Sequence, residues 1–213
     1  NVPQYPVVVA GILRAGCVVV NVNPLYTPRE LEHQLKDSGA KAIVLIELVA
    51  GTLQQVIDAV PTKKIVLASM GDMLGTVKGA LVNYVVRHKK KMVPPFNLPG
   101  AVRFNDAIAQ GRGKAYTAPQ IGPDDIAVLQ YTGGTTGVSK GAVLLHRNLI
   151  ANVLQAEAWY QPALKKIPPG EQIVTVCALP LYHVFGFNSN MMLGLRMGGC
   201  NILIANPRDI GGM

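Results

Sequence analysis

The sequence alternates short apolar runs with segments that carry helix signals. CVVVNV, AKAIVLI and KKIVLAS are runs rich in β-branched residues and suit buried strands. Between the first two, Thr27 can cap a helix, Pro28 fits its first turn, Glu30 completes a capping box and Gly39 ends it. Strands and helices that alternate at this spacing favour β-α-β units. We therefore predict an α/β fold with largely parallel sheets and helices on both faces.

The remaining segments continue this alternation. Residues 73–93 are predicted as one longer helix with a basic end, NYVVRHKKKMVPP. Residues 94–120, rich in Pro and Gly, are typical of a surface connection, here between subdomains. DDIAVLQY and GAVLLH are predicted strands on either side of a glycine-rich loop, and HRNLIANVLQAEAWY is a predicted helix. EQIVTVCALPLYHVFGF is predicted as a strand that ends in a turn, FNSNMMLGLRMG as a helix and CNILIAN as a strand.

The net charge of +8 favours anionic partners such as nucleotides, CoA-like molecules, nucleic acid or an anionic membrane, with a basic part of a longer protein whose acidic remainder is missing as the equal alternative. The mean hydropathy of +0.28 argues against disorder. Polar or charged residues interrupt the apolar stretches, so we predict no membrane-spanning helix. Of the basic residues, Lys89–Lys91 suit either an anionic lipid surface or a solvated helix end. We favour the helix end, because three lysines fall short of the usual ~4–8 unless Arg87 and His88 contribute.

The cysteines and histidines are scattered along the chain. Cys17, Cys177 and Cys200 lie far apart, which predicts buried, reduced thiols and a cytoplasmic protein. The histidines form no metal-ligand cluster in the sequence. Because the chain starts at Asn1 and ends without a clear closing element, we expect it to be part of a longer protein.

The loop YTGGTTGVSKGA has the composition of a phosphate-binding loop. Glycines let backbone N–H groups approach one anion, hydroxyl groups add donors, and Lys140 adds a positive charge. It is not a Walker A loop, since Ser139 takes the second glycine position and Gly141 follows the lysine. A plain glycine hairpin between two strands is the alternative, which the hydroxyl groups and the lysine make less favoured.

This loop resembles the signature Y-T-S-G-T-T-G-x-P-K-G of the adenylate-forming acyl-CoA synthetases. GILRAGCVVVNVNPLYTPRELEHQLKDSGAKAIV, ALPLYHVFGF and GGCNILIANPRDI resemble other blocks of that superfamily in the same order. Together they look most like bacterial long-chain fatty acid–CoA ligases. The sequence departs from the signature at Gly133, where many members have Ser, and at Ser139, where many have Pro.

The resemblance implies a two-step activity. A fatty acid carboxylate attacks the α-phosphate of ATP to give acyl-AMP and pyrophosphate, and the thiol of coenzyme A then displaces AMP. Mg²⁺ would accompany ATP, with the Thr132 hydroxyl as one ligand. Lys140 and His183 are implied as catalytic residues. The residues implied to bind ATP and its phosphates are Tyr131, Thr132, Gly133, Gly134, Thr135, Thr136, Gly137, Ser139, Lys140 and Gly141.

The PLYHVFGF block adds an expected acyl site. His183 is implied to lie near the carboxylate and the α-phosphate, with a strand-end cap as the alternative role. Phe185 and Phe187 are implied to line the acyl tunnel, with plain core packing as the alternative. His183 is expected at the acyl site as well.

The resemblance makes the 213 residues a portion of the N-terminal AMP-binding domain, without the C-terminal domain, and predicts that this chain alone does not make acyl-CoA. It implies no nucleic-acid partner. Peripheral contact with the inner face of the cytoplasmic membrane and a homodimer of the full-length protein stay open. The alternative functions are an aryl-CoA ligase or other adenylation domain, and a non-catalytic nucleotide-binding or membrane-docking module.

Overall fold

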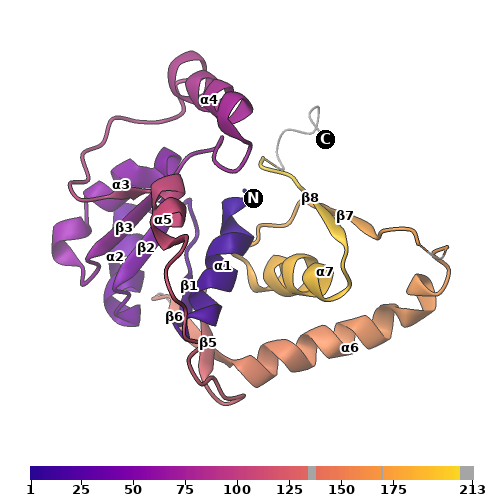
Figure 1. Cartoon of the computed structure of the whole chain (residues 1–213). Coiled ribbons are helices and arrows are strands. Elements are labelled where there is room, and N and C mark those ends of the chain that lie inside the picture. Colours follow the sequence, from indigo (N-terminus) through magenta and orange to yellow (C-terminus); the bar gives the residue numbers. More distant parts are fainter. Residues whose placement is uncertain (134–137, 169, 207–213) are drawn as a thin grey trace. The chain divides into compact units, whose positions relative to one another are not determined.

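Parallel strand pairing dominates the computed structural model, which describes residues 1–133, 138–168 and 170–206 (Figure 1). The chain forms two compact units. Unit 1 combines residues 1–21 with the chain from residue 119 onward, and unit 2 comprises residues 22–118. Among the described residues, four of the five strand pairs are parallel, and they lie in three small sheets. The α/β class is therefore confirmed.

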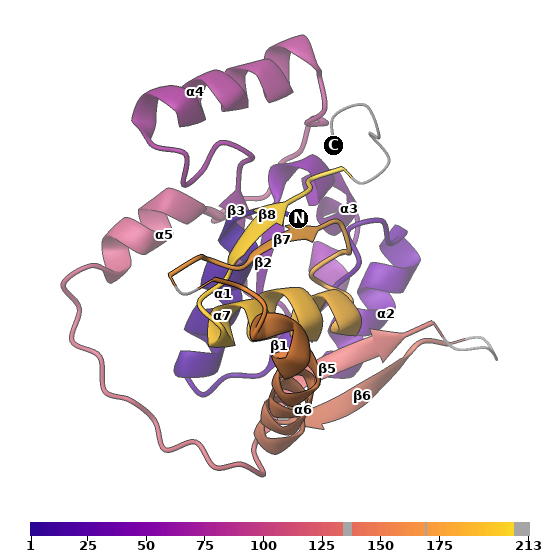
Figure 2. The ribbon, with the colours of Figure 1, turned by 90° about the vertical axis from the view of Figure 1, so that its right-hand side faces the viewer.

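Unit 2 is built on a parallel sheet with the strand order β2-β3-β4. Its strands are β2 (Ala42–Ile46), β3 (Lys64–Ala68) and β4 (Val102–Arg103). Figure 2 shows α5 on one side of β2 and β3, and α2 and α3 on the other side. Side chains from these layers, including Leu35, Leu53 and Leu67, form one buried core. The helices are α2 (Pro28–Ser38), α3 (Ala50–Gln54), α4 (Thr76–Tyr84) and α5 (Phe104–Gly111), with short turns η1 (Glu47–Val49), η2 (Ile57–Ala59) and η3 (Val85–Lys89).

The predicted capping box begins α2 as expected. The Thr27 hydroxyl accepts a hydrogen bond from the Glu30 backbone N–H, and the Glu30 carboxylate accepts one from the Thr27 backbone N–H at 2.8 Å. That second bond, followed by the bond from the Thr27 hydroxyl, lowers the pKa of Glu30 below its ordinary value. Gly39 ends the helix in the left-handed conformation, with φ of 63°.

Unit 1 contains a mixed sheet and a small parallel sheet. The mixed sheet has the order β1-β5-β6, with strands Val19–Asn21, Ile126–Thr132 and Lys140–Leu145. The parallel pair is β7 (Val174–Cys177) and β8 (Cys200–Leu203). The helices are α1 (Gln4–Arg14), α6 (His146–Leu164), η4 (Gly186–Met192, a π-helix) and α7 (Leu193–Arg196). Side chains of α1, β5, α6 and η4 share a second core that includes Val9, Val128, Leu149 and Phe187.

One strand pair departs from the parallel arrangement. β5 and β6 are antiparallel, with Thr132 opposite Lys140 and Tyr131 opposite Gly141. The connection of residues 133–139 is too short for a parallel crossover, which needs about a dozen residues. The glycine loop therefore closes a hairpin, and the sheet around it is mixed.

Three sequence expectations need correction. The helix expected over 73–93 starts only at Thr76, because Met73 and Gly75 have φ of 68° and 80°, and it continues from residue 85 as a π-helical turn. The strand expected from residue 171 spans only Val174–Cys177. Among the three thiols only Cys177 is buried, whereas Cys17 and Cys200 are exposed. The apolar neighbours of a cysteine in the sequence do not decide whether its side chain faces the core.

Candidate active site

The hairpin of β5 and β6 places the ends of the glycine loop side by side. Thr132 and Lys140 are direct partners across the two strands, and both side chains are exposed. Gly133 follows Thr132 and has open space around its Cα. The loop therefore presents a hydroxyl group and a lysine next to each other at its base. The predicted phosphate-binding residues Gly134, Thr135, Thr136 and Gly137 lie outside the described residues.

The other predicted phosphate-binding residues have roles inside the hairpin. The Ser139 hydroxyl donates a hydrogen bond to the Thr132 carbonyl at 2.8 Å, which ties the two ends of the loop together. Tyr131 is buried, and its ring lies so close to Gly141 that a Cβ there would come within 3.1 Å of it. A side chain at position 141 would therefore require the ring of its cross-strand partner to shift. These contacts shape the loop, whereas phosphate binding by these residues stays a prediction.

His183 lies in a tight turn after β7. Its backbone N–H donates to the Pro180 carbonyl at 3.1 Å, and its carbonyl accepts from the Phe187 N–H at 2.8 Å. The ring Nδ1 accepts a hydrogen bond from the Phe185 N–H at 3.3 Å. In the neutral ring the proton is therefore on Nε2, which is left to donate to a ligand oxygen. His183 is exposed.

The two phenylalanines of this block have opposite environments. Phe187 is 1% exposed and belongs to the core of unit 1. Phe185 is 60% exposed. Gly186 between them packs against the Pro180 carbonyl, because a Cβ there would lie 2.4 Å from that oxygen. The structure thus gives the two side chains different surroundings, and their place in an acyl tunnel stays a prediction.

A chain of hydrogen bonds joins the His183 turn to the end of β5. The Tyr5 hydroxyl donates to Asn21 Oδ1 at 2.6 Å, and Asn21 Nδ2 donates to Gln130 Oε1 at 3.1 Å. Gln130 Nε2 then donates to the Tyr182 carbonyl at 3.2 Å. Asn21 and Gln130 are both buried, and burial raises the pKa of the Tyr5 hydroxyl above its ordinary value.

This polar chain brings two motifs together that are distant in the sequence. Gln130 precedes the glycine loop, and Tyr182 precedes His183. The sequence analysis missed Asn21 and Gln130. A polar residue within each of the apolar runs CVVVNV and DDIAVLQY was the signal that could have identified them, since a polar side chain buried in a strand needs a partner.

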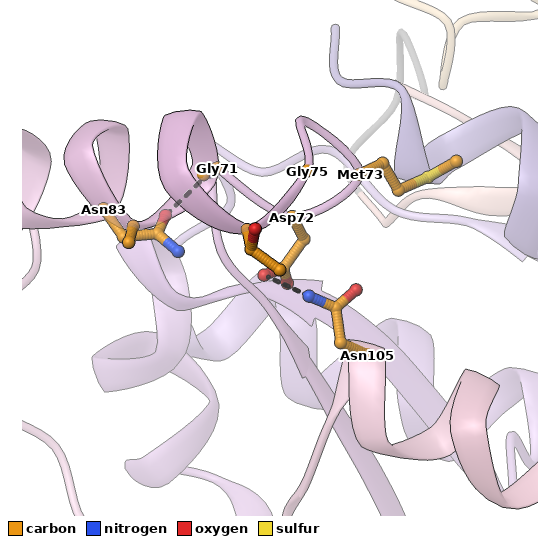
Figure 3. Close-up of a pocket in the computed structure, with 9 residues that line it drawn as sticks. Gly71, Asp72, Met73, Gly75, Asn83 and Asn105 are labelled. Carbon is orange, nitrogen blue, oxygen red and sulfur yellow. Dashed lines mark hydrogen bonds between the residues drawn. The ribbon is translucent and has the colours of Figure 1, made fainter.

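Unit 2 contains a pocket lined by Gly71, Met73, Asn83 and Asn105 among others (Figure 3). Three of its polar side chains make hydrogen bonds within the protein. Asp72 accepts hydrogen bonds from Asn105 Nδ2 at 3.2 Å and from the Ser69 N–H at 2.7 Å, and Asn83 accepts one from the Gly71 N–H at 2.7 Å. We interpret this pocket as a gap left where α4 packs against the rest of unit 2.

The described residues offer no ready-made metal site. Within 1–133, 138–168 and 170–206, no group of three or more His, Cys, Asp or Glu side chains could hold an ion. Mg²⁺ bound with a nucleotide needs only one or two protein ligands, because phosphate oxygens and water supply the others. The exposed Thr132 hydroxyl at the loop base fits a role as one such ligand. In the same ranges, no helix is long and apolar enough to cross a membrane.

The chain belongs to the AMP-binding enzyme family, whose model matches residues 1–211. It is 54% identical over 213 residues to a long-chain-fatty-acid–CoA ligase of Escherichia coli O157:H7, and 30% identical over 215 residues to 4-coumarate–CoA ligase 3 of rice, Oryza sativa subsp. japonica. These matches cover the whole chain but only 37% and 32% of the two relatives. ATP-bound MatB from Rhodopseudomonas palustris matches 95% of the chain and 33% of its own, with a TM-score of 0.62 and 26% identity.

Proposed function

We propose that this chain is part of the N-terminal domain of a long-chain fatty acid–CoA ligase and carries its phosphate-binding loop. The observation that carries the proposal is the 54% identity over the whole chain to the Escherichia coli ligase. The identity to the 4-coumarate ligase is lower, at 30%, and this difference favours a fatty acid over an aryl acid as the substrate. The substrates would be a long-chain fatty acid, ATP and coenzyme A.

The hairpin suits the first of the two chemical steps. When the fatty acid carboxylate attacks the α-phosphate of ATP, negative charge moves onto the departing pyrophosphate. We assign Lys140 and the backbone N–H groups of the glycine loop to the β- and γ-phosphates, where they stabilise this charge. Mg²⁺ with the nucleotide would supply further positive charge, with Thr132 as its protein ligand. The hydrogen bond from Ser139 to the Thr132 carbonyl holds the two strand ends together, so Lys140 lies opposite Thr132.

We assign His183 to the carboxylate and the α-phosphate. Its Nδ1 accepts from the Phe185 N–H, so its Nε2–H is the ring donor left for the ligand. A donor there orients the attacking carboxylate oxygen and stabilises the charge on the α-phosphate. The second step, displacement of AMP by the coenzyme A thiol, leaves a thioester and AMP. A cytoplasmic protein with peripheral contact to the inner face of the membrane suits an acyl substrate that partitions into bilayers.

The test is ATP–pyrophosphate exchange by the intact protein with palmitate, 4-coumarate and other acids. We expect exchange with palmitate, and we expect Lys140→Ala to reduce kcat/KM about 10²–10³-fold, as loss of a preorganised charge does. Lys114→Ala, at another exposed lysine, is the matched control and should leave exchange unchanged. Exchange with aryl acids alone would assign the protein to the aryl-CoA ligases. Equal kcat/KM for the Lys140 variant and the control would refute the role of the loop.

A further inference from the structure

The outer face of α4 is apolar, although an isolated surface helix usually turns such a face inward. Val77, Leu81 and Tyr84 are 83%, 62% and 53% exposed. Their spacing of four and three residues places them on one side of the helix. The other side carries the buried Gly79 and continues to the buried Val86 of η3. Figure 1 shows α4 at one end of unit 2, beyond its sheet.

Contacts on the inner face fix this orientation. Gly79 approaches Gly71 so closely that a Cβ on Gly79 would lie 2.5 Å from the Gly71 carbonyl oxygen. The Gly71 N–H donates to Asn83 Oδ1 at 2.7 Å. Arg87 donates to both carboxylate oxygens of the buried Glu47, at 2.9 and 2.8 Å. Because these groups point into unit 2, the apolar face cannot rotate inward without breaking them.

The structure also changes which basic residues are available at the surface. Arg87 is engaged by Glu47, so it does not add to the exposed cluster. Lys78, one turn from Leu81, is exposed, and so are Lys89, Lys90 and Lys91 after the helix. These four lysines reach the lower end of the ~4–8 basic residues typical of surfaces that bind anionic lipid. No Asp or Glu occurs between residues 76 and 93.

We propose that Val77, Leu81, Tyr84 and the four lysines form a docking surface for an anionic phospholipid membrane, here called the α4 surface. The apolar side chains would enter the boundary of the acyl chains while the lysines meet lipid phosphates. The proposal rests on the proposed function for the reason to visit a membrane, since that is where long-chain fatty acids partition. A second copy of the chain fits less well, because a two-fold interface would bring the lysines of both copies together with no Asp or Glu from residues 76–93 to pair with them.

The charge of the α4 surface is tested with vesicles. We expect the intact protein to co-sediment with vesicles of phosphatidylcholine and phosphatidylglycerol, less so at high salt, and weakly with phosphatidylcholine alone. Lys89→Gln, Lys90→Gln and Lys91→Gln together should weaken binding roughly a hundredfold, about fivefold for each lysine. The control triple Lys114→Gln, Lys165→Gln and Lys166→Gln removes the same charge elsewhere and should stay within about threefold of wild type.

The apolar face is tested with Val77→Ser, Leu81→Ser and Tyr84→Ser together, which should weaken binding at least about tenfold. Val77→Ile, Leu81→Met and Tyr84→Phe keep the face apolar and should bind like wild type. Circular dichroism checks that each variant is folded. The proposal would be overturned if both the glutamine triple at Lys89–Lys91 and the serine triple bound vesicles as well as wild type does. So would a dimer in sedimentation velocity that the serine triple converts to a monomer, because the face would then belong to a second copy.

The same variants show whether the α4 surface or the proposed function has failed. Their ATP–pyrophosphate exchange is measured with palmitate dispersed in detergent, where no membrane is needed. Exchange at the wild-type rate together with lost vesicle binding supports the α4 surface. Vesicle binding through α4 without any exchange on fatty acids would contradict the proposed function alone. Exchange on fatty acids with unchanged vesicle binding in both triples would contradict the α4 surface alone.

Discussion

Gln130 joins the glycine hairpin to the His183 turn through one side-chain amide. Its oxygen accepts from Asn21 and its nitrogen donates to the Tyr182 carbonyl. A buried amide that makes both bonds has few alternative positions, because each lost bond costs about 1–3 kcal/mol of desolvation. We infer that Gln130 is a positioning residue, which holds the segment before His183 at the end of β5.

The variant Gln130→Leu should therefore separate positioning from stability. It leaves the Tyr182 carbonyl and the Asn21 amide without this partner, so the free energy of unfolding should fall by about 1–3 kcal/mol. A small displacement of His183 should lower kcat for adenylation about 10–100-fold, with little change in the KM for ATP. Urea unfolding and ATP–pyrophosphate exchange by the intact protein measure the two effects.

Val128→Ala is the matched control for Gln130→Leu. Val128 is fully buried two residues earlier in the same strand, and its truncation leaves a cavity that costs a comparable free energy. Its side chain takes no part in the hydrogen-bond chain. Should this control lose as much kcat as Gln130→Leu, the loss would follow from instability, and the positioning role would be rejected.

At the scale of elements, the position of α4 depends on one buried carboxylate. Glu47, at the end of β2, is 1% exposed and pairs with Arg87 of η3 and Arg103 of β4. Arg87 also donates to Ser69 Oγ at 2.8 Å, just after β3. A single charged cluster thus links the ends of three strands to the turn that follows α4. A buried carboxylate without such partners would be strongly unfavourable.

We expect Glu47→Gln to lower the free energy of unfolding by about 1–3 kcal/mol. This is less than the cost of breaking a fully buried pair, because Arg87 and Arg103 are partly exposed and water can solvate them. Hydrogen exchange in α4 should quicken while exchange in α2 stays slow. Glu32→Gln, in the exposed pair with Lys36, should change the stability by less than about 0.5 kcal/mol. Equal destabilisation by the two substitutions would contradict the role of Glu47.

At the scale of the whole molecule, the residues that the structure describes form two hydrophobic cores. One lies within residues 22–118, and the other is shared by the start of the chain and the part after residue 119. The sequence analysis placed a connection between subdomains at 94–120. The division into units falls at 118–119, but whether these units are subdomains stays a prediction.

We predict that residues 22–118 fold on their own, because their core lies within the segment. The isolated segment should show a helical circular dichroism spectrum and one cooperative urea transition. Leu53→Ala should lower its free energy of unfolding by about 2–5 kcal/mol, as expected for a fully buried leucine. A non-cooperative transition that this substitution does not change would show that unit 2 needs the rest of the chain.

Local signals in the sequence were sufficient for much of the fold and for the family. Thr27, Glu30 and Gly39 set the bounds of α2, because a cap needs only neighbouring residues. The β-branched runs marked β1, β2 and β3, because strand periodicity is local too. The loop around Lys140 and three other sequence blocks occur in the order typical of adenylate-forming enzymes. Together they were enough to indicate that family.

Contacts between distant residues were decided only by the tertiary structure. The sequence could not tell that Gln130 bonds to Tyr182, that Arg87 turns inward to Glu47, or that Phe187 is buried while Phe185 is exposed. Each of these depends on which surface lies opposite a side chain. That surface is set by strand order and helix packing, which sum over many weak interactions across the chain. Caps, turns and periodicity are determined by a few neighbouring residues, whereas the contact between two residues distant in the sequence depends on the whole fold.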